Sequence, residues 1–149
     1  RANEIASLTK SSFDFEAITW TLAAASAKNR KLTTLPLSPA LADRLRLWFG
    51  KLKRDELFPG SWTDNSHRMA GKMLKRDLKR CGIDYRDASG RVADFHSLRH
   101  TFITSLAKRG VHPSKAQRLA RHSTVTLTMN VYTSLAVDDL RDAVASIGK

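Results

Sequence analysis

The chain has 149 residues, of which 42% are hydrophobic, and a chain of this length can bury one sizeable core. Its 26 Lys and Arg against 14 Asp and Glu give a formal net charge of +12, which indicates a polyanionic partner, most often nucleic acid, with a ribosomal or membrane-surface protein as the alternative. The single cysteine excludes an internal disulfide framework, and no apolar run reaches the roughly 20 residues that a membrane helix needs. We therefore expect a cytoplasmic protein.

The first elements in chain order are a helix end and a hairpin. Apolar residues at helical spacing predict the end of a helix over residues 1–8. Two β-prone stretches, 18–22 and 32–35, predict a β-hairpin. The polar segment 27–31 between them predicts a turn that exposes Lys28.

Helical patterns dominate the rest of the chain. Six further helices are predicted, over residues 39–49, 64–81, 94–109, 113–120, 123–132 and 137–147. Asp64 is the expected cap of the second and Gly82 its expected stop. In the third, Leu98, Phe102 and Leu106 recur every four residues and predict its buried stripe.

The element order predicts the fold class. We expect an α+β fold that is mainly α-helical, with a small antiparallel β-sheet and without the βαβ alternation of a doubly wound sheet. One compact domain is expected over residues 1–149. Because the sequence opens at Arg1, without Met and directly on a helical pattern, we expect a fragment of a longer protein whose upstream domains are absent.

Residues 94–132 carry the groups that phosphodiester cleavage requires. A side chain that cuts DNA needs cations to hold the phosphate oxygens and a proton donor for the leaving oxygen. His96 and Arg99 lie one helical turn apart, and His122 and Tyr132 follow. No Asp or Glu lies between His96 and His122, so this surface has one sign of charge and favours a phosphate partner.

Four stretches of the sequence resemble the motifs of the tyrosine recombinases of the phage integrase family. Asp94 to Phe102 resembles the family's box with a His-x-x-Arg-His core, and Arg121 to Thr133 resembles the closing box that ends Thr-x-x-x-Tyr. Arg1 to Leu8 is similar to the first box, which begins Arg-x-x-Glu, and Lys28 matches the family's β-hairpin lysine. The four stretches occur in the family's order.

The resemblance implies a site-specific DNA recombinase that forms a covalent 3′-phosphotyrosyl intermediate. The implied catalytic residues are Arg1, Lys28, His96, Arg99, His122 and Tyr132. The two arginines would grip the non-bridging oxygens, the lysine would protonate the departing 5′-oxygen, His96 would take the tyrosine proton and His122 would donate a hydrogen bond to the phosphate. The phosphotyrosyl bond retains the energy of the cleaved bond, so metal, ATP and cofactor are not needed.

Some residues have more than one interpretation. Arg30 and Lys31 are rivals for the role of Lys28, and Glu4 either orients the first arginine or forms a weak surface pair. His96 and His100 have the spacing of a metal pair, but no Glu or Cys completes a site, so we expect no metal. A further cation, Arg121, stands where the family commonly has Gly before the second His.

Two other functions remain open from the sequence: a type IB topoisomerase with similar chemistry, and a catalytically inactive DNA-binding module of the same fold. The expected partner is double-stranded DNA in the nucleoid, without a membrane. The resemblance also implies a homotetramer on DNA that is joined through the last helix, 137–147, and accessory DNA-bending proteins.

Overall fold

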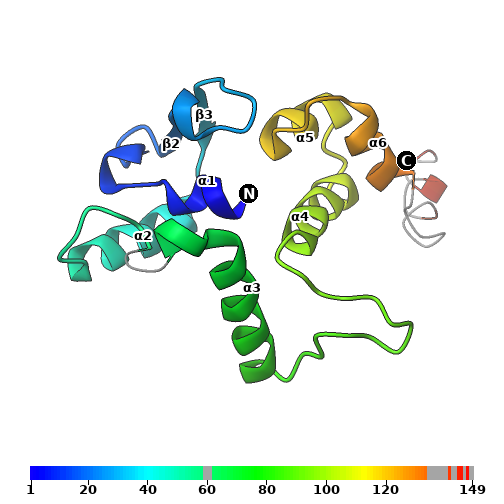
Figure 1. Ribbon diagram of the computed structural model, residues 1–149. Coiled ribbons are helices and arrows are strands. Elements are labelled where there is room, and N and C mark those ends of the chain that lie inside the picture. The colour runs from blue at the N-terminus through cyan, green and yellow to red at the C-terminus, as the bar shows by residue number, and fades with distance from the viewer. Residues whose placement is uncertain (59–61, 134–140, 142–143, 146, 148–149) are drawn as a thin grey trace. The chain divides into compact units, whose positions relative to one another are not determined.

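The computed structural model describes the chain except residues 59–61, 134–140, 142–143, 146 and 148–149 and the side chains of 62–68 (Figure 1). The chain divides into two compact units, an N-terminal unit Arg1–Asp87 and a C-terminal unit Ala88–Lys149. Within the described part of the chain, no helix has the length and apolar character to cross a membrane.

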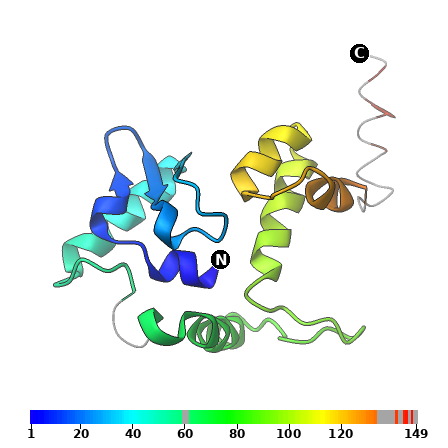
Figure 2. The same ribbon diagram turned by 45° about the horizontal axis from the view of Figure 1, so that its top comes forward.

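The N-terminal unit combines a small sheet with three α-helices. Its elements are α1 (Ala2–Ala6), β1 (Phe13–Asp14), β2 (Thr19–Leu22), β3 (Thr33–Pro36), α2 (Pro39–Lys51) and α3 (Trp62–Arg80), with single 3₁₀ turns at η1 (Lys10–Ser12) and η2 (Ala24–Ser26). The strands form an antiparallel sheet in the order β1-β2-β3 (Figure 2). The predicted hairpin is therefore present, within one residue at each outer end, and the short strand β1 was not predicted.

The core of the N-terminal unit lies beneath the sheet and α2. Leu22 is 1% exposed and pairs across the sheet with Thr33. The buried residues packed together here are Leu8, Leu22, Ala27, Phe49 and Leu57. The Phe13 and Phe49 rings lie 5.2 Å apart, centroid to centroid, and join β1 to α2. This packing fixes the strand register and holds the segment that precedes Lys28.

Helix ends in this unit follow local chemistry with one exception. Ser38 caps α2, because its side chain accepts a hydrogen bond from the Leu41 N–H, and Pro39 occupies the first turn. Gly82 ends α3 with a φ of +66°, as expected. The prediction that Asp64 caps α3 was wrong: the helix starts at Trp62, so Asp64 lies inside it.

The C-terminal unit is built from three short helices that pack on one another: α4 (Ser97–Lys108), α5 (Pro113–Ala120) and α6 (Thr126–Tyr132). The helix expected over 94–109 starts later because the Asp94 carboxylate accepts a hydrogen bond from the Ser97 N–H and sets the start. Ser123 does not begin α6, which starts at Thr126 without a side-chain cap. The helix expected over 137–147 lies largely outside the described residues.

The buried face of α4 differs from the predicted one. Leu98 and Phe102 are 48% and 45% exposed, whereas Ile103 is 1% and Ala107 7% exposed. The predicted stripe was therefore wrong by about one position around the helix. The physical reason is the packing partner: α5 and α6 offer small buried residues such as Ala120, and α4 turns Ile103 and Ala107 toward them.

Candidate active site

In the N-terminal unit, a buried carboxylate joins two of the expected catalytic residues. Glu4 is 4% exposed, and its Oε1 lies 3.0 Å from Nη1 of Arg1. The same oxygen accepts a hydrogen bond of 3.2 Å from the backbone N–H of Lys28. Of the two interpretations of Glu4, the structure supports the orienting one, because a surface pair would leave the carboxylate in water.

The protonation state of Glu4 follows from these contacts. Burial alone would raise the pKa of the Glu4 carboxyl, but the hydrogen bond from the Lys28 N–H and the positive groups of Arg1 outweigh it and lower this pKa from 4.5 to about 2. Glu4 is therefore an anion at neutral pH. It holds the Arg1 guanidinium and the start of the turn that carries Lys28 at one place.

The turn between β2 and β3 distinguishes Lys28 from its two rivals. Lys28, Arg30 and Lys31 all have exposed side chains. The N–H of Arg30 donates to the Ala27 carbonyl and closes the turn, with a φ of +51° at Arg30. Only the Lys28 backbone, among the three, donates to Glu4, so it is the lysine placed next to Arg1 by the fold.

In the C-terminal unit, Tyr132 lies at the end of α6 and packs on the small core of Ile103, Ala120 and Val131. Its hydroxyl donates a 2.5 Å hydrogen bond to the carbonyl of Val111, in the segment between α4 and α5. Burial raises the pKa of the Tyr132 phenol above its ordinary value. The phenol is therefore neutral and held in a defined position, and its reaction as a nucleophile requires a proton acceptor.

His122 follows α5, and its ring is oriented by a buried threonine. His122 Nδ1 lies 3.0 Å from Oγ1 of Thr128, which is 0% exposed. The backbone N–H of His122 donates to the Gln117 carbonyl, and the Gln117 amide donates to the His122 carbonyl. With Nδ1 engaged in this way, Nε2 is the ring nitrogen that is oriented to meet a ligand.

Arg99 gains its position from the corrected face of α4. Arg99, Ile103 and Ala107 follow one another at four-residue spacing, so Arg99 lies on the face of the helix that packs toward α5 and α6. It is half-buried, whereas His96 is exposed and occupies the N-cap position of α4. The C-terminal unit thus brings Arg99, His122 and Tyr132 onto three helices that contact each other, with His96 at the start of the first.

Arg121 forms the C-cap of α5 in a conformation that favours glycine. Its φ and ψ are 55° and 44°, in the left-handed region. The turn before His122 therefore has the shape that Gly would give it, although the residue is Arg. The Nε and Nη2 atoms of Arg121 are buried, so the side chain turns into the protein.

Three contributions to the site were missed by the sequence reasoning. Thr128 was noted only as part of a motif, and Val111 and Gln117 were not considered. The orienting threonine was detectable, since it lies one helical turn before the tyrosine. The Val111 carbonyl gives no sequence signal, because any residue supplies one. Within the described residues, no three His, Cys, Asp or Glu side chains gather as a metal site would need.

Comparison with known proteins places this geometry in a family. Residues 1–138 match the model of the Phage integrase family, and the chain belongs to this family. A tyrosine recombinase XerA from Saccharolobus solfataricus is 38% identical over 93 residues, which cover 62% of this chain and 27% of the relative. A XerA from Pyrococcus furiosus is 28% identical over 146 residues, 97% of this chain and 49% of the relative.

A solved structure supports the fold. The integrase of transposon Tn1549, in complex with transposon right end DNA, superimposes with a TM-score of 0.74 at 20% identity and covers 100% of this chain and 55% of that one. The mainly helical architecture with a small antiparallel sheet is therefore that of an integrase, as expected. The chain spans half or less of the length of both relatives.

Proposed function

We propose that this chain is the catalytic part of a tyrosine recombinase that cuts and rejoins double-stranded DNA through a 3′-phosphotyrosyl bond on Tyr132. The observation that carries the proposal is the C-terminal unit, where Arg99, His122 and Tyr132 lie on three mutually packed helices. Membership of the Phage integrase family and the Tn1549 integrase, solved with DNA, support it.

The proposed step moves one proton at each end of the reaction. Tyr132 Oη attacks the phosphorus and forms the phosphotyrosyl bond, while the bond to the 5′-oxygen breaks. His96 takes the phenol proton, and Lys28 gives a proton to the departing 5′-oxygen. A 5′-hydroxyl from another strand reverses the step with the same groups, so no external energy source enters.

Charge on the phosphate is met by the remaining three residues. Arg1 and Arg99 present guanidinium groups, whose planar donors match the non-bridging oxygens, and His122 donates from Nε2. A hydrogen bond to a charged group is typically worth about 1.5 to 3 kcal/mol, so the loss of either arginine should reduce the rate strongly. Glu4 supports this set because it fixes the Arg1 guanidinium.

The resting position of Tyr132 adds a condition. Its hydroxyl donates to the Val111 carbonyl, and a phenol in that hydrogen bond does not present its oxygen lone pair to a base. We therefore infer that the Tyr132–Val111 bond breaks before attack. Free chain and DNA-bound chain should differ at this contact.

We extend the proposal to the assembly. Recombination pairs two DNA sites, and we propose a homotetramer on nucleoid DNA joined through segment 137–147, with accessory DNA-bending proteins acting at the site. A type IB topoisomerase would act as a monomer with similar chemistry. Deletion of 136–149 should impair assembly more than strand cleavage, and unchanged assembly would favour the monomeric enzyme.

A suicide duplex tests the central step. The chain is incubated without divalent metal with a nicked duplex that traps the cleaved strand, and the covalent adduct is separated on a denaturing gel. Tyr132→Phe should abolish the adduct while salt-dependent DNA binding persists. Tyr85→Phe is the matched control, because Tyr85 is the chain's other tyrosine, and it should leave the adduct unchanged.

The outcomes separate the candidate functions. If DNA binding is tight and neither wild type nor Tyr85→Phe forms an adduct, in this chain or in a longer form of the protein, the chain is a binding module. If Tyr132→Phe still forms an adduct, another nucleophile acts and the assignment of Tyr132 is wrong.

A further inference from the structure

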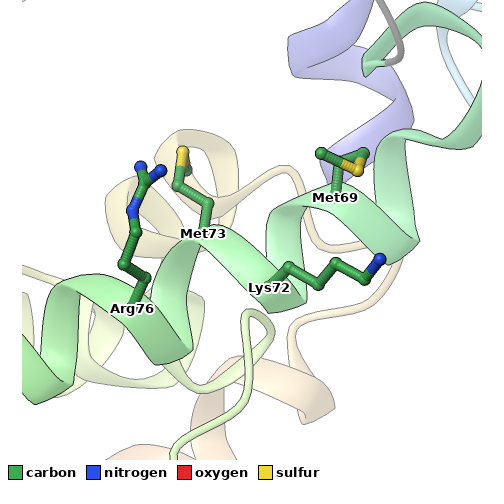
Figure 3. A pocket seen from close by; sticks show the side chains of 4 residues that line it. All are labelled: Met69, Lys72, Met73 and Arg76. Carbon is green, nitrogen blue, oxygen red and sulfur yellow. The ribbon is translucent and has the colours of Figure 1, made fainter.

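A recess on α3 is not used by the proposed chemistry. It has a volume of about 310 Å³ and is lined by Met69, Lys72, Met73 and Arg76 (Figure 3). The two methionines are half-buried, and the two cationic side chains are exposed. The recess therefore combines an apolar floor with a positively charged rim.

The lining residues share one side of the helix. They occupy positions i, i+3, i+4 and i+7, which fall on one face over two turns. Seven residues of α-helix rise about 10 Å, close to three base-pair steps of duplex DNA at about 3.4 Å each. The recess is thus matched in length to a few neighbouring base pairs.

The surroundings of the recess are also basic. Lys75, Lys79 and Arg80 are exposed further along the same helix. Arg76 pairs with Asp77 at 3.5 Å from Nε to Oδ1, but its side chain is 66% exposed, so this pair is weak and exchangeable. A polyanion can therefore take the place of Asp77 at little cost.

We propose that this face of α3 reads DNA sequence in the major groove. The methyl group of a thymine contacts the thioethers of Met69 and Met73, while Arg76 and Lys72 donate to the O6 and N7 acceptors of a neighbouring guanine. The inference rests on the proposed function, since it takes the same duplex as its ligand, and it adds the residues that determine specificity.

The chemistry of the recess selects this ligand over other parts of DNA. Phosphates and sugars offer no apolar group that would cover two thioethers, and the minor groove has no methyl group. The major-groove edge offers a thymine methyl beside guanine acceptors, and the groove is wide enough for an α-helix. A helix that only held the backbone would need the cations without the methionines.

Two-stage binding measurements test the proposal. The 149-residue chain is used to select duplexes from a random-sequence pool, and the enriched duplex is then compared with one in which deoxyuridine replaces each thymine in turn. Loss of the contacted methyl should weaken binding by roughly fourfold, the value of one buried methyl group. Met73→Ala should bind the thymine and uracil duplexes equally.

Matched variants separate base reading from general attraction. Leu47→Ala removes an apolar side chain that is 70% exposed on α2, and it should keep the thymine preference. Arg76→Ala should lose roughly five- to a hundredfold of the preference for the guanine, whereas Lys51→Ala on α2 should at most weaken binding evenly across sequences. Met73→Gln decides the thymine test if Met73→Ala does not fold, which circular dichroism reports.

Each result has a distinct meaning. A thymine preference that survives in Met73→Ala or Met73→Gln overturns the proposal, as does a wild type that binds DNA without any sequence preference. A wild type that binds no duplex at all overturns the proposed function as well, and this result is distinguishable because the salt-dependent binding itself is missing.

Discussion

Glu4 carries more of the N-terminal unit's functional geometry than any other single side chain. One carboxylate oxygen accepts from both the Arg1 guanidinium and the Lys28 backbone. A buried carboxylate is stable only when such partners offset its lost hydration. The position of two proposed catalytic residues therefore depends on one charge that is itself outside the proposed proton transfers.

Glu4→Gln tests this dependence through pH. The pKa of Glu4 falls from 4.5 to about 2 on folding, so the unfolded chain binds the proton first and stability falls with pH from about 4.5 down to about 2. At neutral pH the shift corresponds to at most about 3 kcal/mol. Glu4→Gln should be less stable at pH 7 and lose this acid dependence, as measured by urea unfolding at several pH values.

Glu16→Gln provides the control for this experiment. Glu16 is an exposed carboxylate in the turn after β1, so its replacement should leave both the stability at pH 7 and the acid dependence nearly unchanged. Equal acid dependence of the wild type and Glu4→Gln would show that Glu4 is not the linked group.

Arg121 gives a second prediction at this scale, based on its backbone. A non-glycine residue pays about 1 kcal/mol or more for the left-handed conformation. Arg121→Ala and Arg121→Gly remove the same side-chain contacts, and only the second relieves the backbone. Arg121→Gly should therefore be more stable than Arg121→Ala by about 1 kcal/mol in urea unfolding, and equal stability would mean that the turn before His122 changes conformation.

At the scale of elements, the cap of α5 is joined to the position of the nucleophile. His112 Nδ1 accepts a hydrogen bond from the Ser114 N–H and caps the helix, and the preceding residue, Val111, accepts the Tyr132 hydroxyl. The cap therefore fixes the same short segment that holds the phenol.

His112→Ala should cost about 1 kcal/mol of stability, the usual value of a lost N-cap, and should shift the NMR signals of Tyr132. His112→Asn should restore both, because Asn caps helices well. Ser38→Ala removes the cap of α2 and is the matched control: a similar loss of stability is expected with unchanged Tyr132 signals. A Tyr132 spectrum that is unchanged in His112→Ala would contradict the coupling.

Most helices were predictable from their own sequence, and the errors occurred where packing decides. Pro39 and Gly82 mark helix ends through local backbone chemistry, and the structure confirms both. The buried face of α4 was not predictable, because Leu98 and Phe102 are more hydrophobic than Ala107. The partner helices select the smaller residue, since close approach of helices gains more contact than one large exposed side chain loses.

At the scale of the whole molecule, the two units have separate hydrophobic clusters. The cluster of the N-terminal unit lies within residues 5–58, and that of the C-terminal unit within 103–132. Residues buried in one cluster are therefore not those that stabilise the other. The single domain expected over 1–149 stays a prediction, which the following experiment tests.

Ile103→Ala and Leu22→Ala each remove a side chain that is 1% exposed, and each should cost about 2 to 5 kcal/mol in its own unit. Hydrogen exchange should increase in α4, α5 and α6 for Ile103→Ala and in β2 and β3 for Leu22→Ala. Faster exchange throughout the chain for both variants would show that the two units unfold together as one cooperative domain.

The sequence by itself determined the family, the order of helices and strands, and the residue types of the proposed site, because these depend on local backbone preferences and on motifs of fixed spacing. Only the tertiary structure decided that Glu4 joins Arg1 to Lys28, that Thr128 orients His122 and that the Val111 carbonyl holds Tyr132. These contacts join residues from different turns and helices. Burial, which gives them their strength, is a property of the packed chain.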